Sequence, residues 1–413
     1  PPHPLYRSSA ASDVYKRQDI VYSVDEETTG SVGGNIGYSD FGLMLGFNLQ
    51  EQNFLGSGNT VGIGINKNIY SEMYNLSFMN PYATKDGVSL GYNVYFRETD
   101  YGEFNVANYL TNSNGFGAQF GYPTSDITRL GFNVTYDKTD IDVGTLPALE
   151  IYDFVSAEGN IFETLSVQFS WQRITLNRGL FPTAGSSTVI SLSTTVPGSD
   201  LSYYRSSIRQ RYYRPLSSNF VFGFSGELGY LDAYGDTEET PFFQNFYAGG
   251  PRSLRGFESN TLGPRSTDAP CYEFNYEEKT CPNLIDTDGD GELDAPYINP
   301  YAGSTSRYRD RPIGGNIKVE GSMQLIFRLP FIEDQRSLRS AFFFDFGNVF
   351  SDNCKDYQIN CYKPALEDLR YSYGVGVTWI TGFGPLSLAI SKPTNAGPQE
   401  RTEEFQFTVG NVF

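Results

Sequence analysis

Hydrophobic and polar residues alternate along most of this chain, over stretches longer than the strands of most soluble proteins. In Ile317–Leu329 the odd positions are almost all apolar, whereas the even positions are mostly polar or charged. Leu338–Phe350 places Phe342 and Phe344 on one face and Asp345 on the other. A period of two indicates β-strands with one apolar face. Both stretches exceed the usual strand length of about five or six residues.

The alternation predicts sixteen antiparallel strands, near residues 31–38, 41–50, 59–68, 71–79, 86–98, 113–121, 127–138, 158–172, 186–196, 202–214, 219–231, 314–329, 338–350, 369–380, 384–391 and 403–413. The connections after odd-numbered strands include the long ones: 99–112, 139–157, 232–313, 351–368 and 392–402. Those after even-numbered strands are mostly short: 51–58, 80–85, 122–126, 215–218, 330–337 and 381–383.

This arrangement predicts an all-β fold, a 16-stranded antiparallel transmembrane β-barrel of the outer-membrane type. An even strand count, long loops on one side, short turns on the other and aromatic outer faces are typical of that class. In lipid every backbone amide must be paired, and a closed sheet achieves this. A soluble β-sandwich also alternates, but its strands are shorter and its connections do not alternate so regularly between short and long.

Composition and charge narrow the possible functions. The 413 residues include 30 Tyr, 32 Phe and 43 Gly, and the net charge is −18. This acidity argues against binding to nucleic acid, which needs clustered basic charge. The single histidine is at position 3, so histidine-dependent catalysis and histidine metal sites are not expected. The sequence contains no stretch of 18 apolar residues, so it does not predict a transmembrane helix.

Four cysteines form two close pairs, Cys271 with Cys281 and Cys354 with Cys361. An even number of cysteines in loop-like sequence predicts two local disulfides in an oxidising compartment. A zinc site is the less favoured alternative, because the pairs lie in distant loops. Residues 1–18 lack periodicity and an apolar signal region, and we interpret them as a non-native leader or a disordered tail.

An acidic segment, DTDGDGELD, lies in the predicted 232–313 loop. Its four carboxylates have the spacing of a calcium loop: Asp286, Asp288, Asp290 and Asp294. The first six residues match an EF-hand loop, but position twelve is Tyr297 instead of Glu, and the form is closer to extracellular calcium repeats. Two interpretations stay open: a structural Ca²⁺ site, or a solvated acidic turn. No other cofactor is expected.

The stretch NFYAGGPRSLRGFESNTLGP, Asn245–Pro264, resembles the sixth-loop signature of the outer-membrane protein assembly factors, whose core is Arg-Gly-Phe. Further segments resemble that family in the same order: NFLGSGNTVGIG, NPYATKDGVSLGY, RGLFPTAGS, VPGSDLSYY, FFFDFGNVF and the C-terminal EEFQFTVGNVF. The resemblance covers about residues 19–413. Arg-Gly-Phe alone would be weak evidence, but the ordered set is specific.

The resemblance implies that the sixth loop folds back into the barrel and that its tip contacts the inner wall. The tip residues are Leu254, Arg255, Gly256 and Phe257. In the family, acidic residues on the twelfth and thirteenth strands receive the arginine. Asp345 matches the second, but Gln324 stands at the first position, so the partner is Asp345 alone or Glu320 one pleat away. Whether the tip is a plug or a moving part stays open.

The resemblance also implies a function: a non-enzymatic insertase that folds unfolded outer-membrane proteins into the bilayer. Its expected partners are these clients, accessory lipoproteins, periplasmic chaperones and outer-membrane lipid. Residues 19–29 look like the end of the last POTRA domain and its linker, and 30–413 like the barrel, with long loops extracellular and the N-terminus periplasmic. The alternatives are a TamA-type sister insertase, a two-partner secretion translocator or passive pore, and a receptor barrel.

The first and last strands predict a weak joint in the closed sheet. The first strand contains four glycines: Gly30, Gly33, Gly34 and Gly37. The last strand contains Gly410 and ends at Phe413. Glycine weakens a strand and offers no side chain to fix register. A lateral seam that accepts client strands, as the resemblance also implies, is one interpretation. The other is that the glycines only accommodate barrel curvature.

The calcium hypothesis gives a first testable prediction. We expect Asp286, Asp288, Asp290 and Asp294 to bind Ca²⁺ with a dissociation constant of about 10⁻⁴–10⁻³ M, as in other extracellular modules. Bound Ca²⁺ would relieve the mutual repulsion of the four carboxylates. Isothermal titration calorimetry checks this. Absence of heat at millimolar Ca²⁺ leaves the solvated-turn interpretation.

Overall fold

The computed structural model describes residues 28–39, 42–103, 106–144, 147–271, 274–281, 311–329, 332, 337–358, 361–382 and 384–410. The four candidate calcium ligands, Phe413 and residues 1–27 lie outside this set, so the expectations for them stay predictions. No helix in the described part of the chain is long and apolar enough to cross a membrane.

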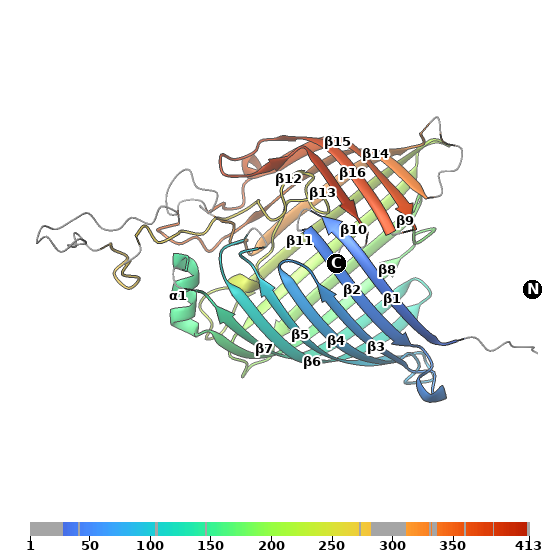
Figure 1. Ribbon diagram of the computed structural model, residues 1–413, viewed down its shortest axis with the longest axis horizontal. Helices are drawn as coiled ribbons and strands as arrows, with labels where there is room; N and C mark the ends of the chain where they lie inside the picture. The colour runs from blue at the N-terminus through green and yellow to red at the C-terminus, as the bar shows by residue number, and fades with distance from the viewer. Residues whose placement is uncertain are drawn as a thin grey trace, which may run out of the picture.

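Sixteen strands close into one antiparallel barrel (Figure 1), which confirms the predicted fold class. They are β1 Gly30–Ser39, β2 Gly42–Glu51, β3 Thr60–Lys67, β4 Ser71–Asn80, β5 Ser89–Asp100, β6 Leu110–Ser125, β7 Thr128–Asp142, β8 Ile161–Ile174, β9 Gly185–Thr195, β10 Tyr203–Pro215, β11 Phe220–Ala233, β13 Ile317–Phe327, β14 Leu338–Phe350, β15 Arg370–Thr381, β16 Gly384–Thr394 and β18 Phe405–Val409. A separate two-stranded sheet pairs β12, Gly256–Phe257, with β17, Thr402–Glu403.

The side chains alternate between the two faces of the wall as the sequence predicts. On β14, Phe342 and Phe344 are 52% and 41% exposed, whereas Phe343 and Asp345 are 4% and 0% exposed. The exposed apolar residues form the outward face, which suits a hydrocarbon environment. Charged residues such as Asp345 take the inward face. This alternation determines which side chains point into the barrel.

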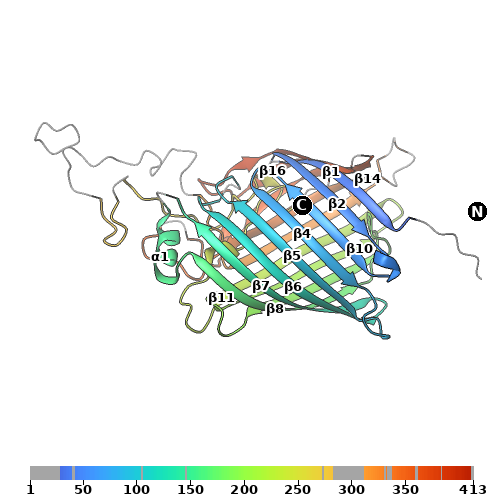
Figure 2. The same ribbon diagram turned by 60° about the horizontal axis from the view of Figure 1, so that its bottom comes forward.

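The two ends of the barrel differ. The long connections and helix α1, Leu149–Glu158, extend from one end, which we call the loop end (Figure 1). The short connections and the start of β1 lie at the opposite end, the turn end (Figure 2). A short 3₁₀ turn, Phe54–Gly56, lies between β2 and β3 at the turn end.

Two details differ from the sequence expectation. The predicted 139–157 loop contains α1, because Ile151 and Phe154 bury one helical face in an apolar cluster at the loop end. The helix is short, so its 3.6-residue period is hard to recognise between two alternating strands. The predicted last strand, 403–413, is interrupted after β17, because Thr402 and Glu403 pair with the loop residues of β12.

Candidate functional site: the Arg-Gly-Phe tip and the β1–β18 seam

The backbone of the long loop between β11 and β13 turns at Gly256. Its φ is +91°, in the left-handed region that favours glycine. An added Cβ would lie 3.1 Å from Ser391 Oγ and 3.3 Å from Ser372 Cβ. Both serines are buried residues of the barrel wall, on β16 and β15. The tip therefore packs closely against this wall, and a larger residue at Gly256 would strain it.

Arg255 forms a two-pronged ion pair with Asp345 on β14. Its Nε donates to Asp345 Oδ2 at 2.7 Å, and its Nη2 donates to Oδ1 at 2.7 Å. The backbone N–H of Arg255 also donates to Oδ2, at 3.2 Å. Asp345 is fully buried, so these donors replace the water that the carboxylate loses. Such paired, parallel hydrogen bonds fix both position and orientation.

Two more inward-facing neighbours hold the Arg255 guanidinium. Nη2 donates to Ser322 Oγ on β13 at 3.1 Å. The guanidinium carbon lies 3.4 Å from the ring centre of Phe343, which supplies a cation–π contact. The planar guanidinium is suited to stacking and forked hydrogen bonding at the same time, which a lysine could not reproduce.

The other two candidate partners of Arg255 have different roles. Glu320 forms an ion pair with Lys318, whose Nζ lies 2.9 Å from Glu320 Oε2 without hydrogen-bond alignment. Lys318 also pairs with Glu227 on β11, at 3.2 Å. Gln324 reaches the tip indirectly, because its Nε2 lies 3.4 Å from the Ser322 Oγ that also accepts from Arg255. Among the described carboxylates, Asp345 is therefore the one that receives Arg255.

The two apolar tip residues are anchors. Leu254 and Phe257 are both fully buried, in a cluster with Leu231, Phe246, Ala248, Leu262 and Val349. The cluster combines side chains of the loop with those of β11 and β14. Burying a side chain of this size contributes about 1.5–3 kcal/mol relative to leaving it exposed. The tip is thus held by apolar burial on one side and by the ion pair on the other.

Gln406 links the tip to the last strand. The backbone N–H of Gly256 donates to Gln406 Oε1 at 3.1 Å, and Gln406 Nε2 donates to the carbonyl of Phe257 at 2.8 Å. Gln406 is a buried residue of β18. Sequence reasoning missed it, although its position between the outward-facing Phe405 and Phe407 marks it as inward-facing. The pattern gave its direction but not its partner.

The seam, where β1 meets β18, is paired far less than the other joints of the described sheet. One residue pair, Tyr38 with Val409, joins the two strands. By contrast, β1 pairs with β2 along its whole length, from Gly30 to Ser39. On the outward face the rings of Tyr38 and Phe407 stack at 5.5 Å between centres.

The predicted seam glycines occupy this joint. Gly30, Gly33, Gly34 and Gly37 all lie on β1. An added Cβ at Gly33 would meet no atom within 4 Å, so the edge is uncrowded there. Gly410 follows β18 with φ +77°, and a Cβ on it would lie 2.2 Å from the carbonyl oxygen of Ile36. This close approach requires glycine at the last described residue.

Both predicted disulfides are present, Cys271–Cys281 and Cys354–Cys361. They lie at the loop end and close loops of ten and seven residues. Within the described residues no group of three or more His, Cys, Asp or Glu side chains is placed to hold a metal ion.

A polar cluster joins three loop-end segments. Asp153 on α1 receives Lys279 Nζ at 2.8 Å and the hydroxyl of Tyr357 at 2.7 Å. Glu150, on the same helix, accepts from the Thr267 N–H at 2.8 Å and the Thr267 hydroxyl at 2.7 Å. Burial raises the pKa of Glu150 from about 4.5 to about 7. Sequence reasoning missed this cluster, because its members are far apart in the chain.

Comparison with known proteins gives the family context. The sequence profile of the Omp85 superfamily domain matches residues 53–413. The outer membrane protein assembly factor BamA of Neisseria meningitidis is 29% identical over 96% of this chain. The chain spans about half the length of that relative (48%). The sorting and assembly machinery component 50 homolog of mouse is 22% identical over 87% of this chain and 67% of its own length.

A solved structure agrees with the fold. The crystal structure of BamA from Haemophilus ducreyi lacking POTRA domains 1–3 is similar, with a TM-score of 0.78 and 30% sequence identity. The similarity covers 97% of this chain and 74% of the solved chain.

The ion pair of Arg255 predicts a large loss of stability. Arg255→Ala leaves Asp345 buried without its cation, and we expect the free energy of unfolding to fall by about 3–5 kcal/mol. Replacing both residues by alanine should recover part of this loss. Chemical unfolding of the purified barrel in detergent micelles measures it.

The pair of Arg209 with Glu227 provides the control, since the Arg209 side chain is 66% exposed and Glu227 keeps a second partner, Lys318. Arg209→Ala should cost about 0–1 kcal/mol. Equal losses for Arg255→Ala and Arg209→Ala would contradict a buried, structurally important pair.

The raised pKa of Glu150 predicts pH-dependent stability at the loop end. Between about pH 4.5 and 7 the unfolded carboxyl is ionised while the folded one stays protonated. Stability of this cluster should therefore fall as pH rises through this range, by at most about 3 kcal/mol, and level off above it. Hydrogen-exchange protection of the Thr267 amide measures this. Glu150→Gln should remove the dependence, and Glu238→Gln, at an exposed carboxyl, should not.

Proposed function

The chain belongs to the Omp85 superfamily, and we propose that it folds and inserts outer-membrane proteins through the seam between β1 and β18. It is a BamA-like outer-membrane β-barrel, of a family of non-enzymatic assembly factors. The single observation that carries the proposal is the seam, with one ladder pair between strands that otherwise pair fully with their other neighbours.

The physical argument starts from the hydrocarbon environment. Backbone amides without partners cost several kcal/mol each in lipid, so a membrane sheet normally closes completely. Here Gly30–Gly37 of β1 have no ladder partner on β18 among the described residues. An incoming strand that paired with this edge would satisfy these groups. Such strand addition uses the main chain for affinity and therefore accepts many client sequences.

We propose that the long loop is folded into the barrel lumen and that its tip supports the last strand. The contacts of Gln406 with Gly256 and Phe257 support this, because they fix β18 from inside. The ion pair with Asp345 fixes the same tip to β14. Opening the seam then needs no change in the tip: β1 can separate while β18 keeps its interior contacts.

The clients in this proposal are unfolded outer-membrane proteins, delivered by periplasmic chaperones and handled together with accessory lipoproteins. The loop end faces the cell exterior and the turn end, with the start of β1, faces the periplasm. The length of the connections at the loop end supports this orientation, since outer-membrane barrels have short periplasmic turns and longer extracellular loops.

A disulfide lock tests the seam. Cysteines at Tyr38 and Val409, which face each other across the joint, should crosslink when oxidised. We expect the locked protein, reconstituted in liposomes, to fold a urea-denatured client barrel at least tenfold more slowly than the unlocked protein. Mild reduction of the engineered bond should restore the rate.

The matched control joins β1 to its other neighbour. Tyr38 also faces Leu43 on β2, so cysteines at these two positions close a joint that the mechanism leaves closed. This crosslink should leave the rate of client folding unchanged. If the Tyr38–Val409 lock leaves client folding at the unlocked rate, the seam is not the route of insertion.

A further inference from the structure

The turn end contains a basic cavity whose ligand is not assigned by the proposed function. Its volume is about 740 Å³, and its lining combines the turns after β8, β10 and β13 with the start of β14. Three arginines contribute to it: Arg178, Arg328 and Arg339. No Asp or Glu is among the described residues that line it; Glu333 and Asp334, in the turn between β13 and β14, lie outside the described residues. In a chain of net charge −18, this local excess of positive charge needs an explanation.

Arg339 is the informative member of the group. It lies near the start of β14, one pleat from the inward-facing Ala341. Tyr213 and Phe181 flank its guanidinium, with ring centres at 4.9 and 5.9 Å. These rings orient the guanidinium, and the Tyr213 side chain also hydrogen-bonds it, but neither ring supplies a negative charge. Its Nη2 is buried and has no hydrogen-bond acceptor among the described residues. A buried, permanently charged group in this state calls for an anionic acceptor.

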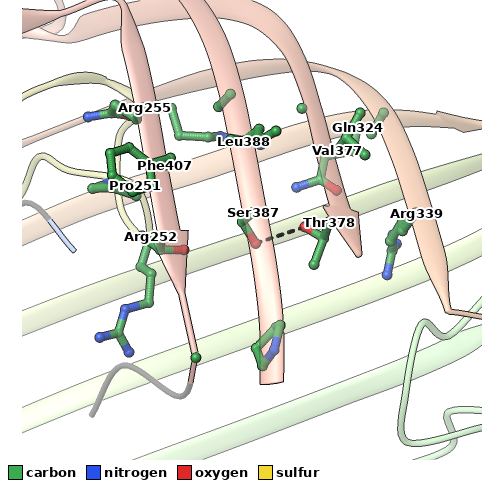
Figure 3. A pocket seen from close by; sticks show the side chains of 17 residues that line it. Pro251, Arg252, Arg255, Gln324, Arg339, Val377, Thr378, Ser387, Leu388 and Phe407 are labelled. Atoms are coloured by element: carbon green, nitrogen blue, oxygen red, sulfur yellow. Dashed lines mark hydrogen bonds between the residues drawn. The ribbon is translucent and has the colours of Figure 1, made fainter. Parts of the chain in front are cut away.

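Arg339 also lines a second cavity, of about 320 Å³, which Figure 3 shows. It therefore belongs to the lining of both cavities. The second cavity runs past Gln324, Thr378 and Ser387 toward Gln406 and Gly410 at the end of β18. Arg252 and Arg255 of the long loop also line it, and no described Asp or Glu does. Its amide and hydroxyl groups can hydrogen-bond the backbone of an extended peptide, and its arginines add positive charge.

We propose that Arg339, with Arg178 and Arg328, binds a carboxylate of an unfolded polypeptide, whose backbone then follows the second cavity toward the seam. A guanidinium pairs with a carboxylate through two parallel hydrogen bonds. The polypeptide is a client segment, and this identification rests on the proposed function. Arg328 and Arg339 lie on the inward side of the wall, whereas lipid contacts the outward apolar face; the position therefore favours a polypeptide over an anionic lipid.

Binding of a peptide to the purified protein in neutral detergent tests the proposal. The probe is an N-acetylated, otherwise uncharged hexapeptide with an uncharged fluorophore, made with a free C-terminal carboxylate or with a C-terminal amide. We expect fluorescence polarisation to show at least tenfold tighter binding of the carboxylate form, as for a charge-assisted pair. Arg339→Gln should abolish this preference, and Arg178→Gln, on an exposed turn, should reduce it severalfold.

The matched control is Arg173→Gln. Arg173 lies at the turn end of β8 and is exposed. It is on the same outward face of the strand as Leu165 and Phe169. The substitution removes the same charge from the same end of the barrel. It should leave the carboxylate preference unchanged.

Three results would overturn the proposal: equal affinity for the two peptides, a preference that survives both Arg339→Gln and Arg178→Gln, or binding of anionic-lipid nanodiscs without binding of the peptide. A fourth result would also overturn it: if inorganic phosphate displaces the peptide at phosphate concentrations below the dissociation constant of the peptide, the cavity is a phosphate site. The assay involves no client folding, so its failure leaves the seam experiment untouched, and failure of the seam lock leaves peptide binding measurable.

Discussion

The requirement that backbone amides be paired in hydrocarbon governs this structure. It explains why sixteen strands close on themselves and why the alternation of side chains runs along the whole wall. It also makes the β1–β18 joint the exceptional place, because one ladder pair there replaces the continuous pairing found at β1–β2. Under the mechanism that we propose, this weakly paired edge of β1 is the one that exchanges partners.

The interior compensates for the weak joint on one side only. β18 is held by its pairs with β16 and by Gln406, which takes both a donor and an acceptor from the Arg-Gly-Phe tip. The tip is held in turn by Asp345 and by the burial of Leu254 and Phe257. β1 receives no comparable support from the loop among the described residues. In the mechanism that we propose, this asymmetry lets β1 separate while β18 keeps its contacts with the tip.

Much of this could be predicted from the sequence, because the period of two reports directly which face each residue takes. It placed Asp345 inward and Phe342 outward, and the structure agrees with both placements. Side-chain partners were harder. The alternation allowed either Asp345 or Glu320 as the ion-pair partner of Arg255. The choice depends on Lys318, because Lys318 forms the ion pair with Glu320. Helix α1, the Glu150–Thr267 contact and the role of Gln406 depend on contacts between distant segments, which no local pattern encodes.

The distribution of charge separates the two ends of the barrel. At the loop end, acidic groups such as Asp153 are matched by Lys279 and Tyr357, and disulfides fix the segments that carry them. At the turn end, arginines line a cavity to which no described Asp or Glu contributes. A basic cavity attracts anionic groups over a distance of about one Debye length, near 10 Å. With the binding site that we propose, a polypeptide would therefore enter from the turn end.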